Sequence, residues 1–230
     1  MKPFEVLYED NHLIAVNKAA GVLVQGDKTG DEPLSELVKK FLKDKYKKPG
    51  NVFCGVIHRL DRPVSGLVVL AKTSKGLERM NGIFQDKKIK KTYVALVKEK
   101  PPQDEARLTH WLVKDHFKNT TKAYENGKKG GKLADLSYKI LGKVHKYYML
   151  EVNPMSGRPH QIRAQLAKIG CPIKGDIKYG YPEKNKDGSI HLHAFQLEFE
   201  HPVKKEPVRL SASLPKDQTW NDYKHLLDEI

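Results

Sequence analysis

The sequence HRLDRPVSGLVVLA (residues 58–71) places a polar segment directly before an uninterrupted apolar run. The run Gly66–Ala71 is short and rich in valine and leucine, which predicts a buried strand. A second predicted strand, Val52–Ile57, precedes the polar segment. Because a loop between two buried strands displays its side chains on a rigid scaffold, we expect this loop to contribute to an active site.

Asp61 is the residue of this loop best suited to chemistry. It lies between Arg59 and Arg62, with His58 nearby. Neighbouring cations favour the charged carboxylate, so Asp61 is a candidate nucleophile or base and a poor general acid. The segment holds no second carboxylate, which argues against the paired acids of glycoside hydrolysis. The alternative, a structural ion pair between Asp61 and an adjacent arginine, stays open at this point.

Toward the N-terminus, the pattern predicts two short strands and an amphipathic helix. The strands are Phe4–Tyr8 and His12–Asn17, and the apolar positions of the helix recur from Leu34 to Tyr46. Asp31 is the expected N-cap of this helix, and Ser74 is the expected N-cap of a second helix.

Toward the C-terminus, strands outnumber helices. The predicted strands are Thr92–Val97, Arg107–Val113, Leu133–Leu141, Lys146–Asn153 and His193–Glu200. We expect a basic loop over Lys114–Lys132, a helix opened by Gly157–Pro159 and ended by Gly170, and a helical C-terminal tail. Since few strands are joined by helices, the predicted class is α+β with a mixed or antiparallel sheet.

The segment from Met155 to Arg163 is the second candidate for a functional role. A helix that begins after a glycine-containing turn, with Arg158, His160 and Arg163 in its first turns, suits an anion. Arg158 and Arg163 are five residues apart, so one can meet a phosphate while the other turns inward toward a carboxylate. A basic surface at the start of a helix is the alternative, and the spacing leaves it open.

The charge balance indicates a polyanionic partner. The 230 residues contain 42 Lys and Arg against 28 Asp and Glu, a net charge of +14. The lysines cluster in Lys39–Lys48, Lys87–Lys91 and Lys114–Lys132, which predicts a phosphate-binding surface, although each cluster alone suits a solvated helix face or loop.

Composition also limits the cellular compartments and the cofactors that we expect for this protein. Two isolated cysteines, no apolar leader and no apolar run long enough to span a membrane predict a cytoplasmic protein without disulfides or membrane contact. His191, His193 and Cys171 lack the further ligands of a closed metal site, so we expect no metal.

Several blocks of the chain resemble the RluA-type pseudouridine synthases. They are HRLDRPVSGLVVL (58–70), GRPHQIR (157–163), CPIKGDIKYG (171–180), YEDNHLIAVNKAAGVLVQ (8–25), KTYVALV (91–97) and HLHAFQLEFEHP (191–202). The resemblance implies a pseudouridine synthase fold, in which helices flank a long mixed sheet with a central RNA-binding cleft. It also implies one catalytic domain over residues 1–230, without a separate N-terminal RNA-binding domain.

The resemblance further implies a role for several residues. Asp61 matches the aspartate that attacks the target uridine, and Arg59 matches the arginine that helps to hold the flipped base out of the stack. Tyr93 matches the tyrosine that packs on uracil, and Arg163 matches the arginine that pairs with the catalytic aspartate. Further candidates for substrate binding are His58, Arg62, Arg158 and His160.

The predicted activity is therefore isomerisation of uridine to pseudouridine in tRNA or rRNA, by a monomer that needs no cofactor. One alternative is a noncatalytic RNA-binding or assembly factor that keeps the fold. It is disfavoured because a binder has no need of the nucleophile. The other alternative, a nucleoside-cleaving hydrolase, is disfavoured by the single carboxylate of the loop.

Overall fold

Continuous and alternating apolar segments fold as strands in the computed structural model, which describes residues 2–230. The strands and helices belong to two compact units, each made of two stretches of chain. Unit 1 holds residues 2–90 and 194–213, and unit 2 holds Lys91–His193 and Leu214–Ile230. The expectation of one catalytic domain over residues 1–230 is a separate question and stays a prediction.

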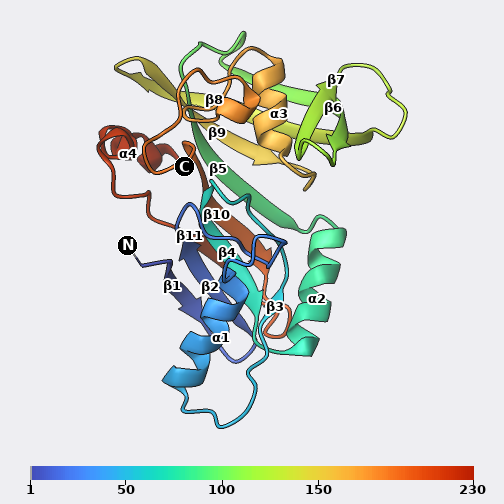
Figure 1. Ribbon diagram of the computed structural model, residues 1–230, viewed down its shortest axis with the longest axis vertical. Helices are drawn as coiled ribbons and strands as arrows, with labels where there is room; N and C mark the ends of the chain where they lie inside the picture. Colours follow the sequence, from blue (N-terminus) through green and yellow to red (C-terminus); the bar gives the residue numbers. More distant parts are fainter. Residues whose placement is uncertain (1) are drawn as a thin grey trace. The chain divides into compact units, whose positions relative to one another are not determined.

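Unit 1 is a sheet with two helices (Figure 1). Its elements are β1 (Phe4–Glu9), β2 (Leu13–Lys18), α1 (Leu34–Lys45), β3 (Gly55–Val56), β4 (Ser65–Ala71), α2 (Ser74–Gln85), most of β10 (Leu192–Glu200) and β11 (Pro207–Ser211). The strands are ordered β1-β2-β4-β10, with β3 paired to β4 and β11 paired to β10. The β2–β4 pairing is antiparallel and runs from Leu13 opposite Ala71 to Lys18 opposite Gly66.

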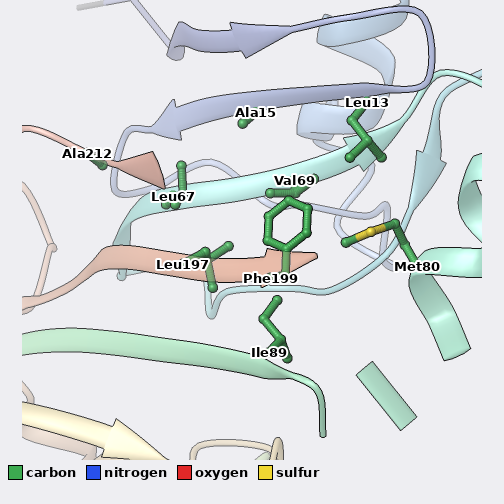
Figure 2. Close-up of a cluster of buried hydrophobic side chains, with 9 residues drawn as sticks. All are labelled: Leu13, Ala15, Leu67, Val69, Met80, Ile89, Leu197, Phe199 and Ala212. Atoms are coloured by element: carbon green, nitrogen blue, oxygen red, sulfur yellow. The ribbon is translucent and has the colours of Figure 1, made fainter. Parts of the chain in front are cut away.

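The core of unit 1 collects every second residue of its central strands. Figure 2 shows Leu67 and Val69 of β4 beside Leu197 and Phe199 of β10, with Met80 of α2 closing the cluster. All seven residues of β4 are buried, so both faces of this strand are covered. The predicted buried strand after the polar loop is therefore confirmed.

Gly66 allows β4 and β10 to approach each other closely. Its φ of +115° is a conformation that L side chains rarely adopt. A Cβ atom at this position would lie 2.3 Å from the carbonyl oxygen of Ala194. The end of the polar loop and the start of β4 therefore require glycine here.

Unit 2 is an antiparallel sheet with α3 packed on it. Its elements are β5 (Ile89–Val97, apart from its first two residues), β6 (Glu105–Asp115), β7 (Thr120–Tyr124), β8 (Lys132–Val144), β9 (Tyr147–Pro154), α3 (Gln161–Lys168), α4 (Gln218–Tyr223) and the 3₁₀ turns Ile177–Tyr179 and Lys224–Glu229. The strand order is β5-β9-β8-β6-β7. Figure 1 shows α3 beside β6 and β7, where Leu112, Ala134 and Ala164 form a small buried cluster.

Both helix caps expected in unit 1 are wrong. The chain stays extended through Pro33, which precedes α1 without a side-chain cap, and Asp31 forms an ion pair with Arg62 instead. Thr73, rather than Ser74, caps α2. Its extended backbone directs the hydroxyl to the N–H of Gly76 at 3.0 Å, so the helix begins at Ser74.

The strand boundaries also differ from the sequence pattern. Val52–Ile57 contains only the two-residue strand β3. Lys114–Lys132 is not a loop throughout, because β7 pairs with β6 inside it. Strand β11, which the pattern did not indicate, pairs with β10. The predicted α+β class is correct, and β6, β8 and β9 pair antiparallel as expected.

We predict that Gly66→Ala prevents unit 1 from folding normally, because the new Cβ collides with backbone atoms that cannot move without breaking the β4–β10 pairing. The soluble yield and the urea midpoint of the purified variant measure this effect.

Gly82→Ala is the matched control. Gly82 lies inside α2 and a Cβ there meets nothing within 4 Å. This variant is expected to gain about 0.5–1 kcal/mol of stability from helix propensity. A Gly66→Ala protein as stable as wild type would contradict the close approach.

Candidate active site

The loop of Asp61 is anchored at both sides of its carboxylate. Leu60 and Val64 are buried, whereas the Asp61 side chain is half-buried. The N–H of Val64 donates to the carbonyl of Asp61 at 3.0 Å, which closes a tight turn. Asp61 is therefore displayed from a fixed turn between β3 and β4, as the sequence predicts.

His58 ties the start of this loop to β4 and α2. Its Nε2 accepts a hydrogen bond from the N–H of Val69 at 3.0 Å, so Nε2 carries no proton. Its ring stacks on Phe84 with 5.0 Å between centroids. These contacts stabilise the loop, and a contact of His58 with substrate stays a prediction.

Arg59 and Arg62 are both exposed but differ in how firmly they are held. Arg62 donates to the carbonyl of Gly21 at 3.0 Å and forms an ion pair with Asp31 at 2.7 Å. Among residues 2–230, the Arg59 guanidinium donates to the side-chain oxygen of Gln25 at a longer distance, 3.5 Å. Arg62 thus links the loop to the segment after β2, whereas Arg59 has the freedom that a base-replacing side chain needs.

Lys18 is a buried cation that the sequence analysis missed. The side chain is inaccessible to solvent, and Nζ donates to the carbonyls of Ala19 at 3.0 Å and Val22 at 2.8 Å. The carbonyl of Arg62 lies at 3.5 Å. The signal in the sequence is weak: a lysine at the end of a strand whose first four residues are apolar.

Burial and the Asp61 carboxylate shift the pKa of Lys18 in opposite directions. The net effect lowers this pKa from 10.5 to about 7, and desolvation is the largest cause. The carboxylate of Asp61 raises the pKa, whereas the cation of Arg62 acts in the same direction as desolvation. Lys18 and Asp61 are therefore electrostatically linked within unit 1.

In unit 2, a hydrogen-bonded turn precedes α3. The Gln161 side chain accepts from the Ser156 hydroxyl at 2.7 Å and from the Arg158 N–H at 3.1 Å, and it donates to the carbonyl of Asp135. Arg158 itself is exposed. The helix begins at Gln161, later than the expected Gly157–Pro159, because this turn occupies the preceding residues.

Arg163 turns inward, as one of the two sequence interpretations expected. Its Nε and one terminal nitrogen donate to the two carboxylate oxygens of Asp176 at 2.7 and 2.8 Å. Both side chains are buried. Asp176, which the sequence analysis included only within the block CPIKGDIKYG (171–180), is thus a partner that it missed.

Tyr179 joins Arg163 to the neighbouring strand. The guanidinium carbon lies 4.8 Å from the ring centroid, within cation–π range. The hydroxyl accepts from the N–H of Thr121 at 2.8 Å and lies 2.8 Å from His160 Nδ1. His160 has a left-handed backbone (φ 53°), which this contact helps to hold.

Tyr93 lies on β5, opposite Val152 of β9. Thr92 and Val94 on either side are buried, so the Tyr93 side chain lies on the less buried face of the strand.

The structure therefore gathers the candidates in two sets. Unit 1 holds Lys18 and the loop residues His58, Arg59, Asp61 and Arg62, whereas unit 2 holds Tyr93, Arg158, His160 and Arg163. The pairing of Asp61 with Arg163 stays a prediction.

Two features are absent from the described part of the chain. The described part of the chain holds no group of three His, Cys, Asp or Glu side chains that could bind a metal. Across residues 2–230, no helix is long and apolar enough to cross a membrane.

Comparison with known proteins gave consistent results. A family profile described as RNA pseudouridylate synthase matches residues 12–168. Ribosomal large subunit pseudouridine synthase C of Buchnera aphidicola is 32% identical, with 92% of this chain and 68% of the relative aligned. tRNA pseudouridine synthase C of Vibrio parahaemolyticus is 31% identical, with 94% and 92% aligned.

A solved structure supports the fold separately. Human RNA Pseudouridylate Synthase Domain Containing 4 matches with a TM-score of 0.78 at 22% identity, covering 97% of this chain and 92% of that one. The fold that the resemblance implied is therefore confirmed.

We predict that Asp176→Asn costs about 3–5 kcal/mol of stability, because it leaves a buried guanidinium without its countercharge. Urea unfolding of Asp176→Asn, Arg163→Met and the double variant measures the coupling. The double variant should cost at least about 1 kcal/mol less than the sum of the two single variants, whereas strictly additive costs would contradict the pairing.

A second prediction concerns the pH dependence of stability. Between pH 7 and 10.5 the unfolded chain binds one more proton at Lys18 than the folded chain does, so stability rises with pH. Relative to Lys18→Met, the free energy of unfolding of the wild type should increase by up to about 1.4 kcal/mol per pH unit in this window. The exposed Lys28 provides the control, since Lys28→Met should run parallel to wild type. A pH-independent difference between wild type and Lys18→Met would contradict the lowered pKa of Lys18.

Proposed function

The chain belongs to the RNA pseudouridylate synthase family and is an RNA isomerase, and on this premise we propose that it modifies tRNA or rRNA with Asp61 as nucleophile. The observation that carries the proposal is the loop of Asp61. It is fixed by buried residues and linked electrostatically to the inaccessible Lys18.

The charges around Asp61 suit this role. The carboxylate lies in sequence between two arginines, and its interaction with Lys18 is attractive while Lys18 is protonated. A carboxylate in such surroundings is directed toward attack or proton abstraction rather than proton donation.

The reaction needs little beyond an ionised carboxylate. The N1–C1′ bond breaks, uracil rotates within the site, and C5 bonds to C1′. The proton of C5 is lost and N1 gains one, so the step is an isomerisation without redox change. Attack of Asp61 on either C1′ or C6 starts this sequence.

Reaching the base requires it to leave the RNA stack, which costs a few kcal/mol. We propose that Arg59 fills the vacated space and that Tyr93 stacks on uracil and takes part in proton transfer. Base–aromatic stacking is worth about 1–3 kcal/mol, enough to offset much of that cost. Arg163 would pair with Asp61 when the substrate is bound, while Asp176 keeps its guanidinium oriented.

The substrate class rests on the relatives and on charge. The two relatives described above are named for the ribosomal large subunit and for tRNA. A net charge of +14 suits either polyanion. His58, Arg62, Arg158 and His160 are proposed to help bind the RNA. The active form is proposed to be a monomeric catalytic domain without a cofactor, working in the cytoplasm on RNA held in a central cleft.

The test uses tRNA and rRNA transcribed in vitro with tritium at C5 of uridine. The wild type is expected to release tritium, because C5 loses its hydrogen. Asp61→Asn should lower release by a factor on the order of 10³ or more, with RNA affinity kept.

Asp86→Asn is the matched control. Asp86 ends α2 and pairs only with the exposed Lys88 in this part of the described chain, so this variant should release tritium normally. Equal release from Asp61→Asn and wild type would reject the nucleophile. Wild-type binding without release would favour the noncatalytic alternative.

A further inference from the structure

Phe117 is the most exposed large apolar side chain in the described part of the chain. It is 99% exposed, whereas the next, Ile177, is 56% exposed. It lies at the turn of the β6–β7 hairpin (residues 105–124), in the segment that the sequence analysis singled out only for its lysines. A bare phenyl ring in water is unfavourable, so a contact that covers it would be stabilising.

The turn that carries Phe117 is held in place. A carboxylate oxygen of Asp115 accepts from the N–H of Lys118 at 2.9 Å. Pairing of β6 with β7 continues up to Asp115 opposite Thr120, directly at the turn. The ring is thus presented on a short, paired hairpin rather than on a loose segment.

The hairpin is fixed to the site in unit 2 close to its turn. The backbone N–H of Thr121 donates to the Tyr179 hydroxyl at 2.8 Å, and its own hydroxyl donates to the carbonyl of Pro159 at 2.9 Å. Tyr179 also contacts Arg163 and His160. The hairpin and His160 therefore share one hydrogen-bonded network, and Arg163 contacts it through the Tyr179 ring.

The charged residues around the ring indicate which class of partner would bind there. Residues 114–132 contain six lysines and two acidic residues. Lys114, Lys118 and Lys122, on and beside the turn, are exposed. An exposed aromatic ring among lysines suits single-stranded nucleic acid, because a base stacks on the ring while phosphates meet the ammonium groups.

We propose that Phe117 stacks on an unpaired base of the RNA substrate while the hairpin lysines hold the adjoining phosphates. The hairpin is then a second RNA contact, in addition to the loop of Asp61. The proposal rests on the proposed function for the RNA, but it concerns affinity rather than the chemical step.

The test compares Phe117→Leu, which keeps an apolar side chain but cannot stack, with Phe117→Trp, which can. With the in vitro transcript that wild type modifies, Phe117→Leu should raise KM about five- to a hundredfold at nearly unchanged kcat. Phe117→Trp should stay within about twofold of wild type. The tryptophan fluorescence of this variant should also change on RNA addition. The change should exceed that of the wild type, whose fluorescence comes from Trp111 and Trp220.

Phe53→Leu makes the same change at a less exposed phenylalanine of unit 1 and should leave KM unaltered. The inference is wrong if Phe117→Leu binds RNA like wild type, or if its only defect is in binding anionic lipid vesicles or in self-association. Absence of pseudouridine with every transcript would reject the proposed function instead. The RNA dissociation constants of the same variants would then still decide the role of the hairpin.

Discussion

Removing an ammonium group from water costs several kcal/mol, and Lys18 offsets that cost only through oxygen atoms that the chain must bring to it. Two carbonyls come from the turn after β2, and the Asp61 carboxylate adds a longer attraction. The same turn is bonded to the Asp61 loop in both directions: the Gly21 N–H donates to the carbonyl of Arg62, and the Arg62 side chain donates back to Gly21. The position of the loop is therefore coupled to the position of one buried cation.

Unit 2 also contains a buried cation that is bonded to oxygen atoms, but the residues are different. The guanidinium of Arg163 is buried but doubly bonded to Asp176, and the ring of Tyr179 covers it. Buried polar networks of this kind favour one arrangement because any other leaves a charge unsatisfied. In each unit, a buried cation is bonded to a turn that also contacts residues expected to meet the substrate.

The sequence was informative where one local signal decides the outcome. The apolar run of β4, the periodicity of α1 and the glycine that ends α3 at Gly170 were all predicted, because strand burial, helix amphipathicity and left-handed caps leave local patterns. The loop of Asp61 was found for the same reason. Strand β7 was missed because lysines and threonines on a largely exposed hairpin resemble a loop. Lys18, Asp176 and Tyr179 were missed because their roles depend on contacts that folding creates, such as Thr121 with Tyr179 across 58 positions.

The contact of Gly66 with Ala194 has a consequence for synthesis of the chain on the ribosome. Strand β4 is complete by Ala71, but its neighbour β10 begins only at Leu192, and all of unit 2 up to His193 is made in between. At about 5–20 residues per second, this delay lasts roughly 6–24 s. During that time the apolar β4 has an open edge, the kind of edge that pairs with other chains. Unit 1 is therefore completed by residues 194–213, which are translated after residues 91–193 of unit 2, and a nascent chain that stops before them lacks strand β10 beside β4.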